Sequence, residues 1–318
     1  MTTVVGTLLA VFLSLATAEA AEVAVLKSSD VPYYDQAVQA FRSSLPSGTK
    51  ITEYNLDGSV AKGRQIAKAL RGTPPDLVFA VGLKAALAAK LELVDTPTVF
   101  CLVLNPESHG LPGPNMTGIL MRIAPGSQLA SIQALTPHAR RIGLLFDEDR
   151  TGDFVEKARR LARRAGLELI AVPVHHSADV PDAVRTLLPQ IDLLWLIQDQ
   201  TVVTQDSLPY ILATTLESKV PVFGFSPTLV QQGALGALAV NARDIGLQAG
   251  RLAGTVLRGG PLPHPALQPP HQPQLALNLN SAEYFGLSPS KDVLRMATVL
   301  YGGPGAVART ETQHEFLP

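Results

Sequence analysis

The sequence of 318 residues has few of the groups that carry reactive or redox chemistry. It contains one cysteine, Cys101, and a lone cysteine excludes a disulfide framework and any zinc or iron–sulfur site built from several thiolates. Charged residues make up only 17%, and 26 Lys and Arg against 27 Asp and Glu leave a net charge of −1. A protein that binds nucleic acid by neutralising phosphates should be basic, so we expect no nucleic-acid partner.

Common catalytic motifs are missing as well. The sequence has no Gly-x-Gly-x-x-Gly after a predicted strand, no P-loop, no Gly-x-Ser-x-Gly elbow and no His-Glu-x-x-His. His175 and His176 are neighbours after a predicted strand, so their side chains point to opposite faces, and no third metal ligand is spaced nearby. We therefore expect neither an enzyme nor a bound metal or cofactor.

The longest apolar run lies at the N-terminus, over residues 4–16. It is too short to span a membrane, which takes about 20 residues, but it has the length of a signal-peptide core. Ala18-Glu19-Ala20 follows with the small-x-small pattern of a cleavage site. We predict a signal peptide over residues 1–21 and a soluble periplasmic or secreted protein. The segment before the run carries no Lys or Arg, which leaves a buried N-terminal helix as the alternative.

From residue 22 onward, short apolar runs alternate with helix-periodic segments in two sets. Continuous apolar runs of this length are typical of strands buried on both faces of a parallel sheet. One of the intervening helices is expected over 153–165, capped by Asp153 and ended by Gly166. The predicted strands are 23–27, 51–55, 77–81 and 98–104 in the first set and 141–146, 167–174, 193–198 and 220–225 in the second.

The two sets can be overlaid at an offset of about 115–120 residues, which favours one β-α-β-α-β-α-β unit used twice. The predicted fold class is α/β, with two doubly wound parallel-sheet lobes joined by a hinge of several strands; chance similarity between generic segments is the alternative.

After residue 225 the alternation stops, and a chain that returns to the first lobe and crosses again would explain the change. We expect a first lobe of residues 22–120 plus about 240–260, a second lobe of 121–239 plus about 274–290, a proline-rich connector over 261–273, and a disordered tail over 302–318. The hinge should lie near 118–124, 236–242 and 270–278.

Ligands of open α/β sheets bind beyond the carboxyl ends of the strands. Applied to both lobes, this rule predicts a small ligand gripped from two sides. Asp199 is the acidic residue of the loop 198–201 and would accept a charge-assisted hydrogen bond from a cationic group of the ligand. The predicted ligand-binding residues are Ser28, Tyr33, Gly82, Leu83 and Asn105 in the first lobe and Phe146, Asp199, Gln200 and Phe225 in the second.

Several of these residues also have a purely structural interpretation. Asp199 could cap a helix that starts near Ser207, and Tyr33 could be the apolar staple of the first helix. Phe146 could be an ordinary core residue, and Asn105 an ordinary turn residue at a strand end.

The order and spacing of several segments resemble a known family. They are Phe79–Ala86, Thr96–Phe100, Leu104–Pro106, Gly113–Gly118, Leu135–Phe146, Gln198–Gln200, Val220–Leu235 and Val240–Gly246. Over residues 22–288 the chain resembles the ABC-transporter substrate-binding proteins of the tryptophan/phenylalanine-binding type, which have the type I periplasmic-binding-protein fold. The resemblance adds Asn241 to the expected ligand-binding residues. Asn105, Gln198, Gln200 and Asn241-Ala242 differ from the acidic, amide and aromatic residues usual in the family, so the resemblance does not specify an aromatic amino acid.

The resemblance implies an exported solute-binding protein of an ABC importer, a monomer that closes two lobes on a small molecule and presents it to a membrane permease. The same module could instead serve as a periplasmic sensor that signals to a membrane kinase or receptor. An exported α/β enzyme is the third reading, and it would need a nucleophile–base pair that the sequence does not offer.

Overall fold

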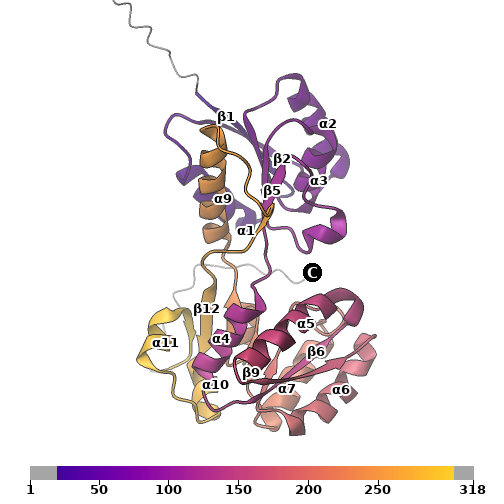
Figure 1. The fold of residues 1–318 in the computed structure, drawn as a ribbon, viewed down its shortest axis with the longest axis vertical. Helices are drawn as coiled ribbons and strands as arrows, with labels where there is room; N and C mark the ends of the chain where they lie inside the picture. Colours follow the sequence, from indigo (N-terminus) through magenta and orange to yellow (C-terminus); the bar gives the residue numbers. More distant parts are fainter. Residues whose placement is uncertain (1–19, 304–318) are drawn as a thin grey trace, which may run out of the picture.

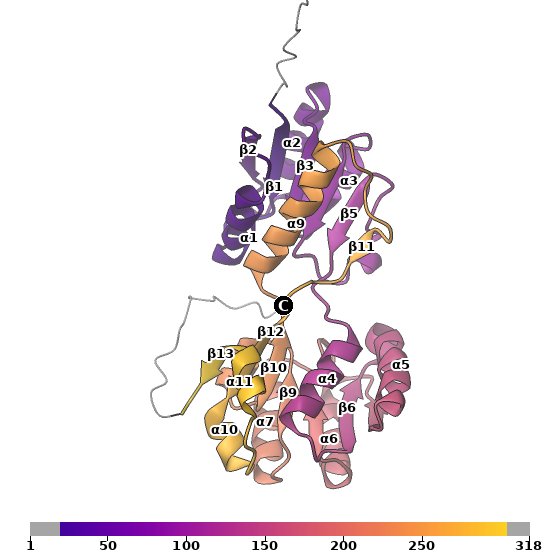
Figure 2. The ribbon, with the colours of Figure 1, turned by 60° about the vertical axis from the view of Figure 1, so that its left-hand side comes forward.

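The computed structural model describes residues 20–303 and shows two α/β lobes, one above the other (Figures 1 and 2). The first lobe is built on a six-stranded sheet of order β11-β5-β4-β3-β1-β2, in which every neighbouring pair is parallel. Its strands are β1 (Glu22–Lys27), β2 (Lys50–Asn55), β3 (Leu77–Val81), β4 (Thr98–Cys101), β5 (Met116–Ile119) and β11 (Leu267–Gln268).

Helices cover both faces of this sheet. One face packs against α1 and α9, and the opposite face packs against α2 and α3. The helix α9 belongs late in the sequence yet lies beside α1 (Figure 2). The two helices approach so closely that a Cβ on Gly246 would lie 2.2 Å from the carbonyl oxygen of Ala37. The helices of the first lobe are α1 (Pro32–Ser43), α2 (Val60–Gly72), α3 (Leu83–Glu92), the short 3-10 helix η1 (Pro106–His109) and α9 (Ala242–Leu257).

The second lobe has a seven-stranded sheet of order β13-β12-β10-β9-β8-β6-β7. The strands from β10 to β7 are parallel, and β12 is antiparallel to β10. The chain enters β12 from the first lobe, at the edge where the parallel strands end, so β12 runs the opposite way. The strands are β6 (Arg141–Phe146), β7 (Glu168–Pro173), β8 (Leu193–Trp195), β9 (Val222–Gly224), β10 (Gly236–Ala239), β12 (Gln274–Asn278) and β13 (Ala297–Tyr301).

Side chains of β6 and β8 alternate between two cores. Leu193 and Trp195 enter the core shared with α4 and α5, while Leu194 enters the core shared with α6 and α7. Because the side chains on both faces of these strands are buried, the strands are continuous apolar runs in the sequence. The helices of this lobe are α4 (Pro125–Leu135), α5 (Glu148–Arg164), α6 (Val180–Leu187), α7 (Ser207–Glu217), α8 (Pro227–Gln231), α10 (Leu279–Tyr284) and α11 (Lys291–Met296), with 3-10 helices η2 (Ser177–Asp179) and η3 (Leu188–Gln190).

Within residues 20–303 the chain crosses between the lobes three times: between β5 and α4, between β10 and α9, and between β11 and β12. The predicted fold class, two doubly wound parallel-sheet lobes, is confirmed, with the antiparallel β12 as an addition. None of the helices in this part of the chain is both long and apolar enough to cross a membrane. The predicted signal-peptide core and most of the predicted disordered tail lie outside the described residues.

The prediction that Asp153 caps the helix expected over 153–165 is wrong. The helix α5 begins one and a half turns earlier, at Glu148, because the side chain of Asp147 accepts a hydrogen bond from the backbone N–H of Asp149. The apolar periodicity starts only at Phe154, which concealed the polar first turns. The predicted end is confirmed, since Gly166 adopts a left-handed φ of +71° directly after the last helical residues.

Five strands, β5, β10, β11, β12 and β13, lie outside the eight strands predicted from the sequence. The strand β11 lies in the proline-rich connector, where its two residues can pair because they form the edge of the sheet. Cys101 is fully buried on β4, and burial raises the pKa of its thiol.

Candidate ligand-binding site

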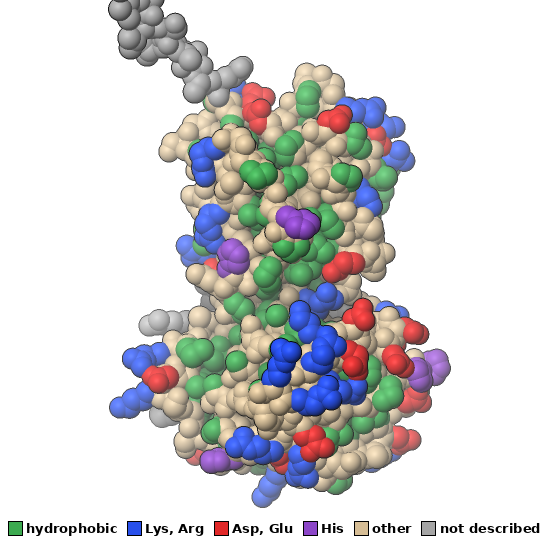
Figure 3. Space-filling model, in the orientation of Figure 1, with side chains coloured by type: hydrophobic (Ala, Val, Ile, Leu, Met, Phe, Trp, Pro, Cys, Tyr) green, Lys and Arg blue, Asp and Glu red, His purple; other side chains and the backbone are tan. Residues whose placement is uncertain are grey.

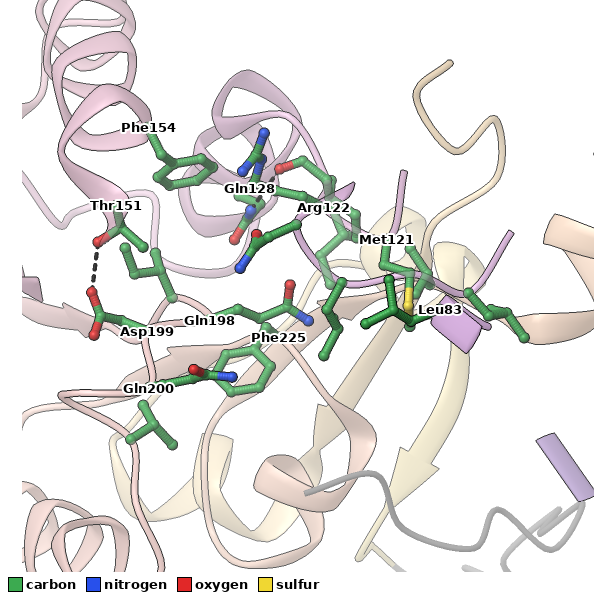
Figure 4. A pocket seen from close by; sticks show the side chains of 18 of the residues that line it. Leu83, Met121, Arg122, Gln128, Thr151, Phe154, Gln198, Asp199, Gln200 and Phe225 are labelled. Atoms are coloured by element: carbon green, nitrogen blue, oxygen red, sulfur yellow. Dashed lines mark hydrogen bonds between the residues drawn. The ribbon is translucent and has the colours of Figure 1, made fainter. Parts of the chain in front are cut away.

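A cavity of about 410 Å³ lies between the lobes (Figure 4). Its walls come from the segments that follow the carboxyl ends of strands in both sheets and from the connecting segments. The lining side chains are mainly apolar, aromatic or amide. They are Tyr33, Tyr34, Leu83, Leu102, Leu104, Asn105 and His109 from the first lobe; Met121, Arg122, Ile123 and Val240 at the crossings; and Gln128, Thr151, Phe154, Ile197, Gln198, Asp199, Gln200, Val203, Phe225 and Leu238 from the second lobe.

Two tyrosines at the start of α1 form an aromatic part of the first-lobe wall. The hydroxyl of Tyr33 donates to the carbonyl oxygen of Val240, 3.2 Å away, which joins α1 to the crossing segment after β10. Burial raises the pKa of both phenols, so they stay protonated at neutral pH. The backbone of Gly82, with φ +84°, leaves room for Tyr34, since a Cβ there would lie 2.6 Å from the Tyr34 hydroxyl oxygen.

The second-lobe wall is anchored to the only tryptophan of the sequence. The ring of Phe154 meets the fully buried Trp195 edge to face, with centroids 5.7 Å apart. The indole N–H of Trp195 donates to Oε1 of Gln128 at 3.0 Å, and Nε2 of Gln128 donates to the carbonyl oxygen of Ile123 at 2.9 Å. These contacts hold Phe154 and Gln128 in place and put the tryptophan one residue away from any ligand in the cavity.

The carboxylate of Asp199 is used inside its own lobe. The residue is 2% exposed, and Oδ2 accepts hydrogen bonds from Thr151 Oγ1 at 2.6 Å and from the backbone N–H of Asp147 at 2.8 Å. Oδ1 accepts from the backbone N–H groups of Thr201 and Val202, at 2.9 and 3.2 Å. Each oxygen therefore accepts twice, and the carboxylate ties the loop after β8 to the start of α5. It does not cap α7, whose N-cap residue is Asp206.

Asp147 supports the same junction. Its Oδ2 accepts a hydrogen bond of 2.6 Å from the hydroxyl of Thr201, and Arg150 lies 3.3 Å away. The Thr201 hydroxyl, the Asp149 N–H and the Arg150 guanidinium favour the charged form and lower the pKa of Asp147. The β8 loop and the N-terminus of α5 are thus linked by two buried carboxylates.

The wall of the cavity carries a cationic side chain, that of Arg122. Arg122 lies on the segment between β5 and α4, and one of its guanidinium nitrogens is 3.4 Å from Glu107 in an exposed pair. In the view of Figure 4, Arg122 lies on the same side of the cavity as Phe154 and Gln128, across from Gln200 and Phe225.

Six of the predicted ligand-binding residues line the cavity: Tyr33, Leu83, Asn105, Asp199, Gln200 and Phe225. Their contact with a ligand remains a prediction.

The other four, Ser28, Gly82, Phe146 and Asn241, do not line the cavity, and their contact with a ligand likewise remains a prediction. Ser28 Oγ accepts from the backbone N–H of Ala85 at the start of α3. Phe146 is a core residue, and Asn241 caps α9 through the backbone N–H groups of Arg243 and Asp244. Gly82 acts by making room for Tyr34.

Arg122, Gln128 and Phe154 line the cavity but were not among the ligand-binding residues predicted from the sequence. Phe154 lay in the helix predicted over 153–165, and Arg122 fell within the range expected for the hinge. Neither position carries a motif, and only the arrangement of the two lobes brings them to one cavity.

Fold and cavity together define a two-lobed small-molecule binding protein. The family model described as ABC transporter substrate binding protein matches residues 22–300, and the chain belongs to this family. A curated relative, a tyrosine-binding protein of Clostridioides difficile strain R20291, is 26% identical over 243 residues, which cover 72% of this chain and 70% of that protein.

Solved structures share the fold. A ligand-free, open substrate-binding protein with adhesive properties from Clostridium difficile has a TM-score of 0.74 and 20% identity, covering 89% of this chain and 100% of that one. The ABC domain in complex with L-Trp from Streptococcus pneumonia has a TM-score of 0.58 and 23% identity, covering 88% and 99%.

Proposed function

We propose that this chain is the exported solute-binding component of an ABC importer. It closes its lobes on a small ligand, an amino acid or a similar small polar molecule, and presents the ligand to a membrane permease. It acts as a monomer, without a cofactor, and catalyses no reaction on its ligand.

The observation that carries this proposal is one cavity with walls from both lobes. Its volume of about 410 Å³ is within the range of small-molecule sites, which hold ligands in spaces of about 300–1,000 Å³. Since neither lobe alone encloses the cavity, a bound ligand makes both sets of contacts only when the lobes approach, and binding therefore favours closure. Three crossing segments are a suitable hinge for that motion.

The comparisons support the same function. The family consists of substrate-binding proteins, and a relative named for tyrosine and a neighbour bound to L-Trp favour a ligand of amino-acid size.

A thermal-shift screen of amino acids, small amides, organic acids and sugars tests the proposal. A ligand present at 100 times its Kd should stabilise the protein by about 2.7 kcal/mol. Small-angle scattering with and without the best hit should then show a smaller radius of gyration in the bound state. The absence of any stabilising ligand, or tight binding without a change of shape, contradicts the proposal.

A further inference from the structure

The cavity offers no carboxylate that is ready to receive a cationic group. Asp199 is the acidic residue among the lining side chains of residues 20–303, and both of its oxygens already accept two hydrogen bonds. All four donors, from Asp147, Thr151, Thr201 and Val202, belong to the second lobe. A rigid-body closure of the lobes leaves these bonds intact, so closing does not release the carboxylate for a ligand.

Two first-lobe carboxylates that are close in sequence to lining residues are no better placed. Asp35 follows Tyr34 directly, but its Oδ1 lies 2.6 Å from the ammonium of the buried Lys27. Glu107 lies 3.4 Å from the guanidinium of Arg122 and is not among the residues that line the cavity. Among the lining side chains, an α-ammonium group would therefore meet neutral oxygens, such as those of the amide side chains, as acceptors.

A cationic side chain that lines the cavity is, by contrast, available to a ligand. Arg122 lines the cavity, and its pairing with Glu107 is an exposed contact of 3.4 Å, a kind of ion pair that contributes little and is readily exchanged for a better one. A guanidinium binds a carboxylate through two parallel hydrogen bonds. Lys and Arg side chains also gather on the face of the second lobe just below the waist of the molecule, over α5 (Figure 3). A concentration of positive charge on a protein surface favours the approach of anions.

The rest of the cavity suits an apolar body. Phe154 and Phe225 come from the second lobe, and Tyr33, Tyr34 and Leu83 from the first, so rings and aliphatic groups stand on both sides. Burying an aromatic ring between such walls supplies most of the binding free energy without any charged partner.

We propose that the ligand is a carboxylate with an apolar or aromatic body, that Arg122 binds the carboxylate group, and that an α-amino group adds little to its affinity. This inference rests on the proposed function and narrows its ligand class from amino acids in general to apolar carboxylates, with or without an amino group.

Three probes of one skeleton separate the charged groups. L-Phenylalanine carries both groups, 3-phenylpropanoate keeps only the carboxylate, and 2-phenylethylamine keeps only the amine. Binding is measured by calorimetric titration and by the fluorescence of Trp195, which contacts Phe154 and Gln128 of the wall. We expect 3-phenylpropanoate to bind within tenfold of L-phenylalanine, and 2-phenylethylamine to bind at least 30-fold more weakly than either, the loss typical of removing one partner of a buried charged hydrogen bond.

Arg122→Gln should weaken 3-phenylpropanoate by about 30-fold or more and leave 2-phenylethylamine unchanged. Arg140→Gln is the matched control, because Arg140 is exposed and lies outside the cavity, and its affinities should equal those of the wild type.

The outcomes separate this inference from the function it rests on. If L-phenylalanine binds more than 30-fold more tightly than 3-phenylpropanoate, or if a sugar or other compound without a carboxylate outcompetes both, the inference is overturned while the proposed function stands. If no compound of the screen binds at all, both are overturned. Equal loss in the Arg122 and Arg140 variants overturns the role of Arg122.

Discussion

Asp199→Asn tests whether this carboxylate serves the fold or the ligand. The substitution keeps the shape of the side chain but replaces one accepting oxygen with an NH₂ group. Placed toward the Oδ2 position, that group can donate to the Thr151 hydroxyl, but it leaves the backbone N–H of Asp147, now 2.8 Å from Oδ2, without an acceptor. Placed the other way, it leaves the N–H groups of Thr201 and Val202 without one. At least one buried donor is therefore unsatisfied in either orientation.

An unsatisfied buried N–H costs about 1–3 kcal/mol, which in a folding unit of this size lowers the melting temperature by roughly 2–12 °C. We expect this loss in the unliganded protein, together with ligand affinity within about threefold of wild type at temperatures where the variant is folded. Melting curves without ligand and calorimetric titration with the best ligand of the screen measure the two quantities.

Asp206→Asn is the matched control, because Asp206 undergoes the same chemical change in the same loop region, is exposed, and makes no side-chain capping hydrogen bond. Its melting temperature should not change. If Asp199→Asn instead melts like the wild type and binds 30-fold or more weakly, the interpretation from sequence alone, in which Asp199 holds a cationic group of the ligand, is correct and the structural argument is refuted.

Three further predictions follow from the site and the chain. Because the pKa of Asp147 is lowered in the folded protein, its charged form stabilises the fold above the ordinary Asp pKa of about 3.9, and this stabilisation is lost as the pH falls through the lowered value. The difference in melting temperature between wild type and Asp147→Asn should therefore be full at pH 7 and shrink toward pH 3. A difference that does not depend on pH contradicts this prediction. Gly82→Ala should weaken ligand binding by about tenfold, because the added Cβ displaces Tyr34. Gly48→Ala is the control: Gly48 has a similar positive φ but open space around it, so this substitution should lower the stability of the fold without changing ligand affinity. Equal affinities of the two variants count against this role of Gly82. N-terminal sequencing of the exported protein should show that the first 20 or 21 residues are gone, and an intact start in the cytosol refutes the predicted signal peptide.

Part of the cavity could be predicted from sequence because strand ends are local features. The loops after β8 and β9 follow apolar runs that must be buried strands, so Gln200 and Phe225 could be placed at the edge where ligands bind. The same rule also selected Phe146 and Ser28, which end strands but point into the core or cap a helix. A strand end fixes where a residue lies along the sheet, whereas the direction of its side chain depends on neighbours far away in the sequence.

The amino-acid sequence by itself determined the alternation of strands and helices, because apolar periodicity and turn residues act over a few positions, and it thereby determined the α/β class and the doubled architecture. Only the tertiary structure decided which groups face the ligand. It brought Arg122 from a crossing segment and Phe154 from a helix to one cavity, and it engaged both oxygens of Asp199 with donors from α5 and the β8 loop. The physical reason is that a charge is available to a ligand only when no nearer donor or acceptor has satisfied it, and those partners are set by packing between segments that are up to about 50 residues apart along the chain.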